Sequence, residues 1–157
     1  MKRLLFITGI ILAQVSAIAS DSLSVIYRIR LDSDIDKSAQ RLVTLGLEKA
    51  DKADADFVLI DIDTYGGAVD AADSIRSAIL RYERPVAVYV NMQAASAGAL
   101  ISIACDSIYM KTGSSIGAAT VVDQTGNVMP DKYQSFMRGM MRSTAQATGR
   151  DPYIAES

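Results

Sequence analysis

The chain contains no histidine and no tryptophan, and Cys105 is its only cysteine. Without histidine the usual imidazole general base and the commonest transition-metal ligand are both missing, so we expect neither a metal site nor a cofactor. A lone cysteine cannot close an intramolecular disulfide, and it has no histidine with which to form a nucleophilic pair. A hydrolase of this composition must take its general base from lysine, aspartate, glutamate or tyrosine.

An excess of charge of either sign is also missing. The 157 residues include 16 lysines and arginines against 18 aspartates and glutamates, which gives a net charge of -2. A nucleic-acid-binding domain needs a basic face for the phosphates, so we exclude nucleic acid as a partner. Half of the residues are apolar, which is enough for one hydrophobic core and a single domain.

The N-terminal segment differs in composition from the rest of the chain. Two basic residues are followed by an apolar run over residues 4–12 and then by small residues, an order typical of a secretory signal peptide. The apolar run is shorter than the roughly 20 residues of a membrane-spanning helix, which favours cleavage near Ala19 or Ser20 over an uncleaved anchor. We therefore expect residues 1–20 to be a signal peptide and residues 21–157 to form an exported domain.

Beyond residue 20, strand patterns alternate with helix patterns. Apolar residues recur with a period of two or in short continuous runs, and these stretches are followed by amphipathic segments of helical period. Such repeated strand, turn and helix units predict an α/β fold around a mostly parallel sheet. The predicted strands are 24–31, 57–62, 86–90 and 107–110, with short strands within 113–126, and the predicted helices are 33–52, 70–82, 96–104 and 130–149.

Ser96 stands where a predicted strand and a tight link, 91–95, run into a helix of small residues. Small neighbours let a peptide approach the hydroxyl, and the start of a helix offers free N–H groups and a partial positive charge to an oxyanion. This arrangement makes Ser96 a candidate nucleophile and the N–H of Ala97 a candidate oxyanion donor. Serine is equally a favoured helix N-cap, so these residues alone leave a purely structural role open.

A glycine pair and a lysine bear on whether Ser96 is catalytic. Gly66 and Gly67 follow a buried strand, at the edge where parallel α/β sheets place their sites, and glycines there allow a close approach of the backbone. The Gly67 N–H is therefore a second candidate oxyanion donor, although glycine pairs are common in plain turns.

Lys132 is the candidate general base. It lies at a helix start, which disfavours a protonated amine, and a general base must be unprotonated. The alternative is a solvated surface lysine.

Three motifs, in this order along the chain, resemble the membrane-bound ClpP-class serine proteases of the NfeD group. They are DTYGGA at 63–68, AASAG at 94–98 and SSIGA at 114–118. Lys132 then precedes a helix that ends in AQATGR, which is also similar to the family. The resemblance extends from about Val25 to the end of the chain. The sequence departs from the family at Tyr65, where a proline is expected before the glycine pair, and this departure bears on the Gly67 donor.

The resemblance implies the ClpP/crotonase-like fold, with a domain that is incomplete at its C-terminus. It also implies a Ser–Lys dyad, in which Lys132 takes the proton of Ser96 while the N–H groups of Gly67 and Ala97 bind the oxyanion. The reaction implied is the hydrolysis of peptide bonds in hydrophobic segments of membrane-associated proteins.

Substrate contacts are expected at Gly66, Ala95 and Gly117, with the substrate strand pairing with backbone near Gly67 and over 117–122. The resemblance further implies a stomatin-like membrane partner and self-association into a dimer or a larger oligomer. It places the domain at the membrane, on the periplasmic side in a bacterium with two membranes.

Several rival interpretations keep the same fold. A crotonase-type acyl-CoA enzyme would use carboxylates such as Asp70 and Asp73, but export argues against a CoA substrate. A signal peptide peptidase of the SppA type shares export and Ser–Lys chemistry. Its lysine lies in another domain, whereas Lys132 belongs to the same domain as Ser96, so Lys132 argues against this type. A catalytically inactive module that binds or scaffolds a membrane complex is the non-enzymatic alternative. The methionines of the 130–149 helix are interpreted as core, with a partner-binding face as the alternative.

Overall fold

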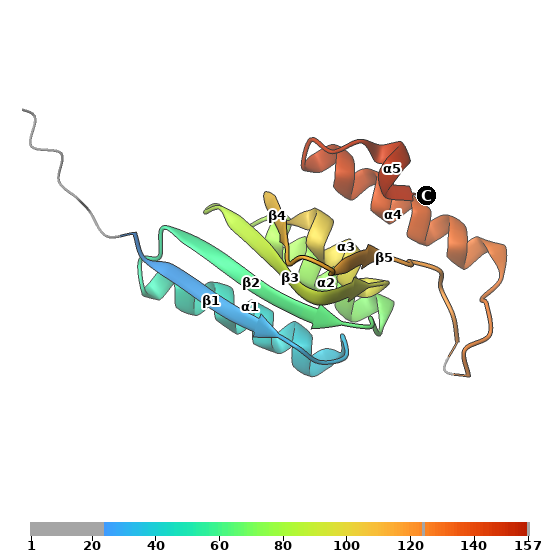
Figure 1. The fold of residues 1–157 in the computed structure, drawn as a ribbon, viewed down its shortest axis with the longest axis horizontal. Helices are drawn as coiled ribbons and strands as arrows, with labels where there is room; N and C mark the ends of the chain where they lie inside the picture. The colour runs from blue at the N-terminus through green and yellow to red at the C-terminus, as the bar shows by residue number, and fades with distance from the viewer. Residues whose placement is uncertain (1–23, 124, 157) are drawn as a thin grey trace, which may run out of the picture.

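A computed structural model describes residues 24–123 and 125–156 (Figure 1). The predicted signal peptide therefore lies outside the described residues, and its cleavage stays a prediction. Strands and helices alternate through most of the described chain, as the sequence predicts. Their order is β1 (Ile26–Leu31), α1 (Lys37–Lys52), β2 (Phe57–Thr64), α2 (Val69–Leu80), β3 (Val86–Ala95), α3 (Ala97–Ala104), β4 (Ser107–Met110), β5 (Ser115–Gly117), α4 (Asp131–Ala147) and α5 (Pro152–Glu156).

The named strands form one sheet in which every pair is parallel. The order is β1-β2-β3-β4, and β5 pairs with β3 beyond the end of β4. Parallel strands require crossover connections, which α1, α2 and α3 supply. The predicted α/β fold with a mostly parallel sheet is confirmed.

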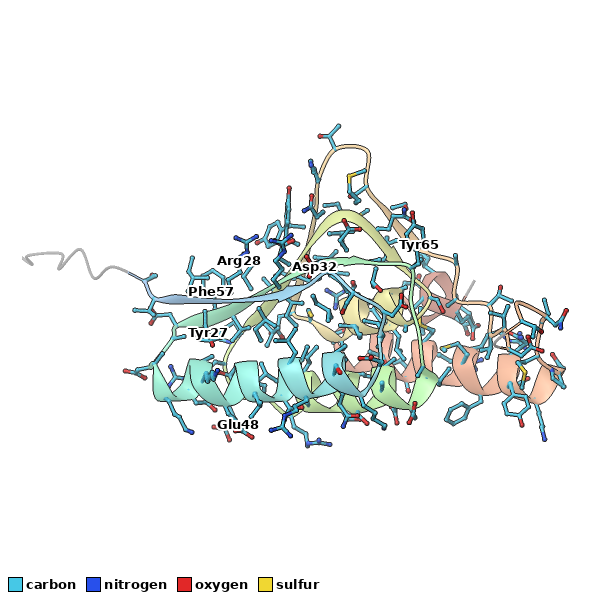
Figure 2. All side chains as sticks on the ribbon, turned by 90° about the horizontal axis from the view of Figure 1, so that it is seen from below. Tyr27, Arg28, Asp32, Glu48, Phe57 and Tyr65 are labelled. Atoms are coloured by element: carbon cyan, nitrogen blue, oxygen red, sulfur yellow. The ribbon has the colours of Figure 1, made fainter. Side chains whose placement is uncertain are left out.

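The helices lie on one side of the sheet, as Figure 2 shows, and the core lies between the two layers. Val58, Ile60 and Ile62 of β2 are fully buried on this side. On the other side, Phe57 and Leu59 are only half-buried, although the apolar run of 57–60 is typical of a strand covered on both faces. The reason is that no described helix packs on that second face of the sheet.

Strand β3 is longer than predicted, because it continues to Ala95 where a tight link was expected from Asn91. Its extra residues have pairing partners on both sides, since Thr64 of β2 pairs with Ala94 and β5 pairs along Gln93 to Ala95. Such partners are far apart in sequence, so the local pattern did not reveal them.

The helices differ from the predictions at the start of α1 and in the presence of α5. The N-cap of α1 is Asp36, whose carboxylate accepts a hydrogen bond of 2.9 Å from the Ala39 N–H, so the helix begins at Lys37 and not at residue 33. The short helix α5 was not predicted. In α4 three methionines are buried, as expected for core residues, whereas two aromatic residues of the same helix are exposed. The buried residues are Met137, Met140 and Met141, and the exposed ones are Tyr133 and Phe136.

Candidate active site

Ser96 occupies a sharp turn between β3 and α3, and its backbone has φ 53° and ψ -114°. Positive φ is uncommon for a residue with a Cβ, and it is found where the surrounding structure enforces it. Ser96 stands at the N-cap position of α3, yet its side chain makes no capping hydrogen bond. The hydroxyl is therefore not used in the way that the structural alternative requires. This strand-to-helix turn is the geometry that presents a nucleophilic serine in α/β hydrolases.

Gly66 packs directly against this turn. A Cβ at this position would lie 2.7 Å from the Ser96 Cβ and 3.3 Å from the Ser96 Oγ, and the backbone has φ 117°. Only glycine fits such a contact. The Gly66 N–H donates to the Thr64 Oγ1 at 3.1 Å, so this group is not available to a substrate.

The next residue, Gly67, lies against Ile35, which joins the glycine turn to the segment before α1. The Ile35 N–H donates to the Gly66 carbonyl at 2.8 Å, and the Ala68 N–H donates to the Ile35 carbonyl at 2.7 Å. The Gly67 N–H makes no hydrogen bond with any residue of the described chain, and Gly67 is exposed. It therefore remains free to bind an oxyanion.

Ala97 is the first residue of α3, so its N–H has no partner within the helix. The positive end of the α3 dipole lies at the same place and favours a negative charge. Ser96 and Ala97 are therefore adjacent at a helix start, while Gly66 brings the Gly67 turn against Ser96. The structure brings the two glycines, Ser96 and Ala97 together, and whether they act as an oxyanion hole stays a prediction.

Gly117 and Ala95 also lie beside Ser96. The Ser96 N–H donates to the Gly117 carbonyl at 2.7 Å, and Ala95 pairs with Gly117 in the β3–β5 ladder. Gly117 and Ala118 both have positive φ, 134° and 56°, so the chain turns away from the sheet here. The two predicted substrate-binding residues are thus within the same site as the serine.

Lys132 is the predicted site residue that the structure does not connect to the others. It is exposed in the first turn of α4, and its Nζ lies 4.9 Å from the centre of the Tyr133 ring in a cation–π contact. Lys132 and Ser96 both lie in the described part of the chain, and the Lys132 amine makes no hydrogen bond with the Ser96 hydroxyl. The dyad therefore stays a prediction, since catalytic hydrogen bonds often form only when substrate is bound.

A groove of about 760 Å³ reaches Gly117, whose carbonyl accepts the Ser96 N–H, although Ser96 and the glycine pair do not themselves line it. It is lined by residues of α3, β5, α4 and α5. Most of its wall is aliphatic, which suits apolar peptide side chains. Its apolar lining residues include Ala99, Ile103, Ile108, Ile116, Met137 and Met141.

Sequence reasoning missed Thr64, a buried residue at the end of β2. Its hydroxyl donates to the Ser33 carbonyl at 2.8 Å and accepts the Gly66 N–H, so it shapes the glycine turn. A Cβ at position 98 would lie 2.7 Å from the Thr64 methyl group, so glycine at this position allows α3 to lie close to β2. The signal available in the sequence was a hydroxyl residue at the end of an apolar strand, directly before the glycine motif.

The other candidate chemical groups lie apart from this site. Cys105 is fully buried at the end of α3, and burial raises the pKa of its thiol, so it is not a nucleophile. Within the described ranges, no cluster of three or more cysteine, aspartate or glutamate side chains could hold a metal ion. The same residues contain no helix long and apolar enough to cross a membrane.

The family of the chain follows from comparison with known proteins. Residues 25–157 match the family described as the N-terminal domain of NfeD1b. The chain belongs to this family. The resemblance inferred from the three sequence motifs is therefore confirmed.

Two curated relatives support this assignment. Membrane protein NfeD1b of Bacillus subtilis is 37% identical over 130 residues, which are 83% of this chain and 30% of the relative. Membrane-bound protease PH1510 of Pyrococcus horikoshii is 30% identical over 166 residues, which cover 99% of this chain and 37% of the relative. The chain thus spans about a third of the length of either protein.

Solved structures with a similar fold include two of the membrane-bound stomatin-specific protease 1510-N. A serine-to-alanine mutant gives a TM-score of 0.79 at 29% identity, covering 85% of this chain and 68% of that one. A lysine-to-alanine mutant in complex with a substrate peptide gives 0.80 at 29% identity, covering 86% and 65%. ClpP1 from Listeria monocytogenes shares the fold, with a TM-score of 0.60 at 22% identity over 83% of this chain and 76% of its own. The predicted ClpP-like fold is confirmed.

Proposed function

We propose that this chain is the protease domain of a membrane-associated serine endopeptidase in which Ser96 is the nucleophile. The observation that carries the proposal is the Ser96 turn, with positive φ, a hydroxyl that does not cap α3, and unpaired N–H groups at Gly67 and Ala97. A structural serine has no need of this combination. The similarity to 1510-N, a protease studied with a serine mutated, supports the same function.

In the proposed reaction, the neutral amine of Lys132 accepts the hydroxyl proton of Ser96 as the Oγ attacks the scissile carbonyl carbon. The carbonyl oxygen becomes an anion and accepts hydrogen bonds from the Gly67 and Ala97 N–H groups. Lys132 then gives its proton to the leaving amine, the C–N bond breaks, and Ser96 remains acylated. Water attacks the ester with Lys132 as base, which releases the new carboxylate and restores the serine.

Lys132 must leave its contact with Tyr133 for this reaction, because its amine lies over the Tyr133 ring. A cation–π contact at an exposed site contributes only about 0.5–1 kcal/mol, so substrate binding can offset its loss. Burial of the amine under an apolar peptide would favour its neutral form, which is the form that acts as a base. The lysine mutated in the peptide complex of 1510-N supports assigning this role to a lysine.

The apolar groove beside Ser96 supports a substrate with hydrophobic side chains. We place the substrate backbone along Gly66 on one side and along Ala95 and Gly117 on the other, where it would add a strand to the exposed edge of β5. A stomatin-like membrane protein is the proposed partner, by analogy with the stomatin specificity of 1510-N. We further propose self-association and a location at the membrane, on the periplasmic side in a bacterium with two membranes.

The deciding measurement is the turnover of a hydrophobic fluorogenic peptide between pH 6 and pH 10. Ser96→Ala and Lys132→Ala should each lower the rate by more than about 10³-fold, because nucleophile and base act as a unit. The wild-type rate should rise with pH as the amine loses its proton. Lys52→Ala, at an exposed lysine in the last turn of α1, is the matched control and should leave turnover unchanged. Equal turnover in wild type and both dyad variants would refute the assignment.

A catalytically inactive binding module is the second candidate, and the orientation of Lys132 favours it. The name of the NfeD1b relative describes a membrane protein and does not mention protease activity. Such a module would bind the same apolar peptide in the groove without cleaving it. Saturable peptide binding with no Ser96-dependent turnover at any pH would decide for this candidate.

A further inference from the structure

The side chain of Gln134, in the first turn of α4, makes three hydrogen bonds to the chain that leads away from β5. Its Oε1 accepts the Val121 N–H at 3.0 Å, and its Nε2 donates to the Val121 carbonyl at 2.7 Å and to the Met129 carbonyl at 3.1 Å. The amide thus pairs with both backbone groups of Val121, as a neighbouring strand would. No charged side chain can copy this pattern, because it needs one acceptor and two donors.

Residues 117–121 form a short segment, called the bridge below, that leads from the Ser96 turn to Val121. The bridge is anchored at its other end, where the Gly117 carbonyl accepts the Ser96 N–H at 2.7 Å. Between the anchors, residues 118–120 line the apolar groove, and within the described chain their backbone groups make no hydrogen bonds. The bridge is therefore fixed at both ends and has unpaired backbone groups in the middle, beside the serine.

Gln134 also lies two residues after Lys132 on the same helix. We propose that Gln134 is a positioning residue that holds residues 118–120 extended for pairing with a substrate backbone and fixes this segment relative to Lys132. The inference rests on the proposed protease function, since it assigns the segment to substrate. Gln134 is one of the residues that line the groove, but the proposed role of its amide is to hold the 118–120 segment and not to contact the reacting atoms.

The physical argument concerns the entropy of the bridge. With Gln134 in place, the backbone of residues 118–120 is ordered before a substrate arrives, so binding does not have to order it. Without the amide, the Val121 N–H and the Met129 carbonyl lose their partner, and Val121 is held only by the 2.9 Å hydrogen bond from the Met129 N–H to its carbonyl, so this end of the segment is fixed less firmly. Peptide binding should then weaken, although Ser96, Gly67 and Ala97 remain unchanged.

The test uses Gln134→Glu in the Ser96→Ala background, where binding is measured without turnover. At pH 8 the carboxylate would face the two carbonyl oxygens of Val121 and Met129, so we expect the affinity for a capped ten-residue apolar peptide without titratable groups to fall about tenfold. As the pH falls to 4 the carboxyl gains a proton and can donate again, so most of the affinity should return. A residue needed only for folding would not produce this reversal.

Gln146→Glu is the matched control, because Gln146 is exposed on α4 and its side chain has no hydrogen-bond partner among the described residues. Fluorescence anisotropy of the labelled peptide from pH 4 to pH 8 measures both variants. An affinity of Gln134→Glu that equals that of Gln146→Glu across this range, or that stays low at pH 4, overturns the inference. If the affinity of Gln134→Glu recovers at pH 4 but the wild-type chain cleaves no peptide, the protease proposal is refuted and the positioning role of Gln134 is still supported.

Discussion

Ser96 is held in a backbone conformation that costs free energy. A residue with a Cβ at such φ and ψ typically costs about 1–3 kcal/mol, which neighbouring contacts must offset. The contacts are the 2.7 Å hydrogen bond from the Ser96 N–H to the Gly117 carbonyl and the bonds from the Ala99 and Leu100 N–H groups to the Ser96 carbonyl, at 3.0 and 3.3 Å. Both backbone groups of Ser96 are therefore used, while its hydroxyl remains free for chemistry.

The contact between Gly66 and Ser96 gives a prediction at the residue scale. Gly66→Ala places a Cβ 2.7 Å from the Ser96 Cβ, so the serine must shift away from the Gly67 and Ala97 donors. We expect peptide turnover to fall by about 10²-fold or more, as for the loss of an oxyanion donor. Initial rates with the fluorogenic peptide measure the effect.

Gly113→Ala is the control for backbone strain. Gly113 also has positive φ, 85°, but a Cβ there would have open space around it, and the residue lies outside the site. Gly113→Ala should lower the free energy of unfolding by about 1–2 kcal/mol and Gly66→Ala by at least as much, because of its overlap with Ser96, but only Gly66→Ala should lose turnover. A comparable loss of turnover in both variants would show that strain, and not the Ser96 contact, is responsible.

At the scale of elements, one arginine joins the helix after the glycine turn to the helix that carries Lys132. Arg76 of α2 donates hydrogen bonds to Thr144 and to Ser143 of α4, the second at 3.5 Å, and it pairs with Asp73 at 2.9 Å. Thr144 is fully buried and the Arg76 side chain is 17% exposed. The two helices therefore meet through a charged group that is mostly removed from water.

We expect Arg76→Met to lower the free energy of unfolding by about 1.5–3 kcal/mol, because a largely buried charged hydrogen bond is lost. Urea denaturation followed by circular dichroism measures the change. Arg81→Met, at the exposed end of the same helix, is the control and should stay within about 0.5 kcal/mol of wild type. If the two variants lose equal stability, the Arg76 bonds do not hold α2 against α4.

At the scale of the whole molecule, the sheet has one covered face and one open face. Arg28 and Phe57 point away from the helices, whereas Tyr27 points toward them (Figure 2). The open face has an apolar trough of about 650 Å³ that includes Leu59 and Tyr109, the latter 60% exposed. The Ser96 site lies instead at the carboxyl ends of β2 and β3, where parallel sheets place their ligands.

The N-terminal segment supplies a prediction for the whole chain. When the full chain is expressed in a bacterium, mass spectrometry of the intact protein should give a mature start near Asp21. Replacing Ala17 and Ala19 with leucine should block cleavage, because the processing site requires small residues. Recovery of the wild-type chain with residues 1–20 still attached would instead support an uncleaved anchor.

The order of strands and helices, and the family, were predictable from the sequence. Periods of 2 and 3.6 arise because each element buries one face, and this property is local, so β1, α1, β2 and α2 were found close to their observed positions. The glycine pair and Ser96 were found because turn residues have local backbone requirements. The motifs that carry the family resemblance are likewise short and continuous.

Only the tertiary structure decided how these residues meet. The extension of β3 to Ala95 depends on strands distant in sequence, and the positive φ of Ser96 depends on Gly66 and on the Gly117 carbonyl. The sequence by itself determined the elements and the candidate residues, since these follow from local periodicity and turn chemistry. Their distances depend on contacts between segments far apart in the chain, which no local pattern encodes.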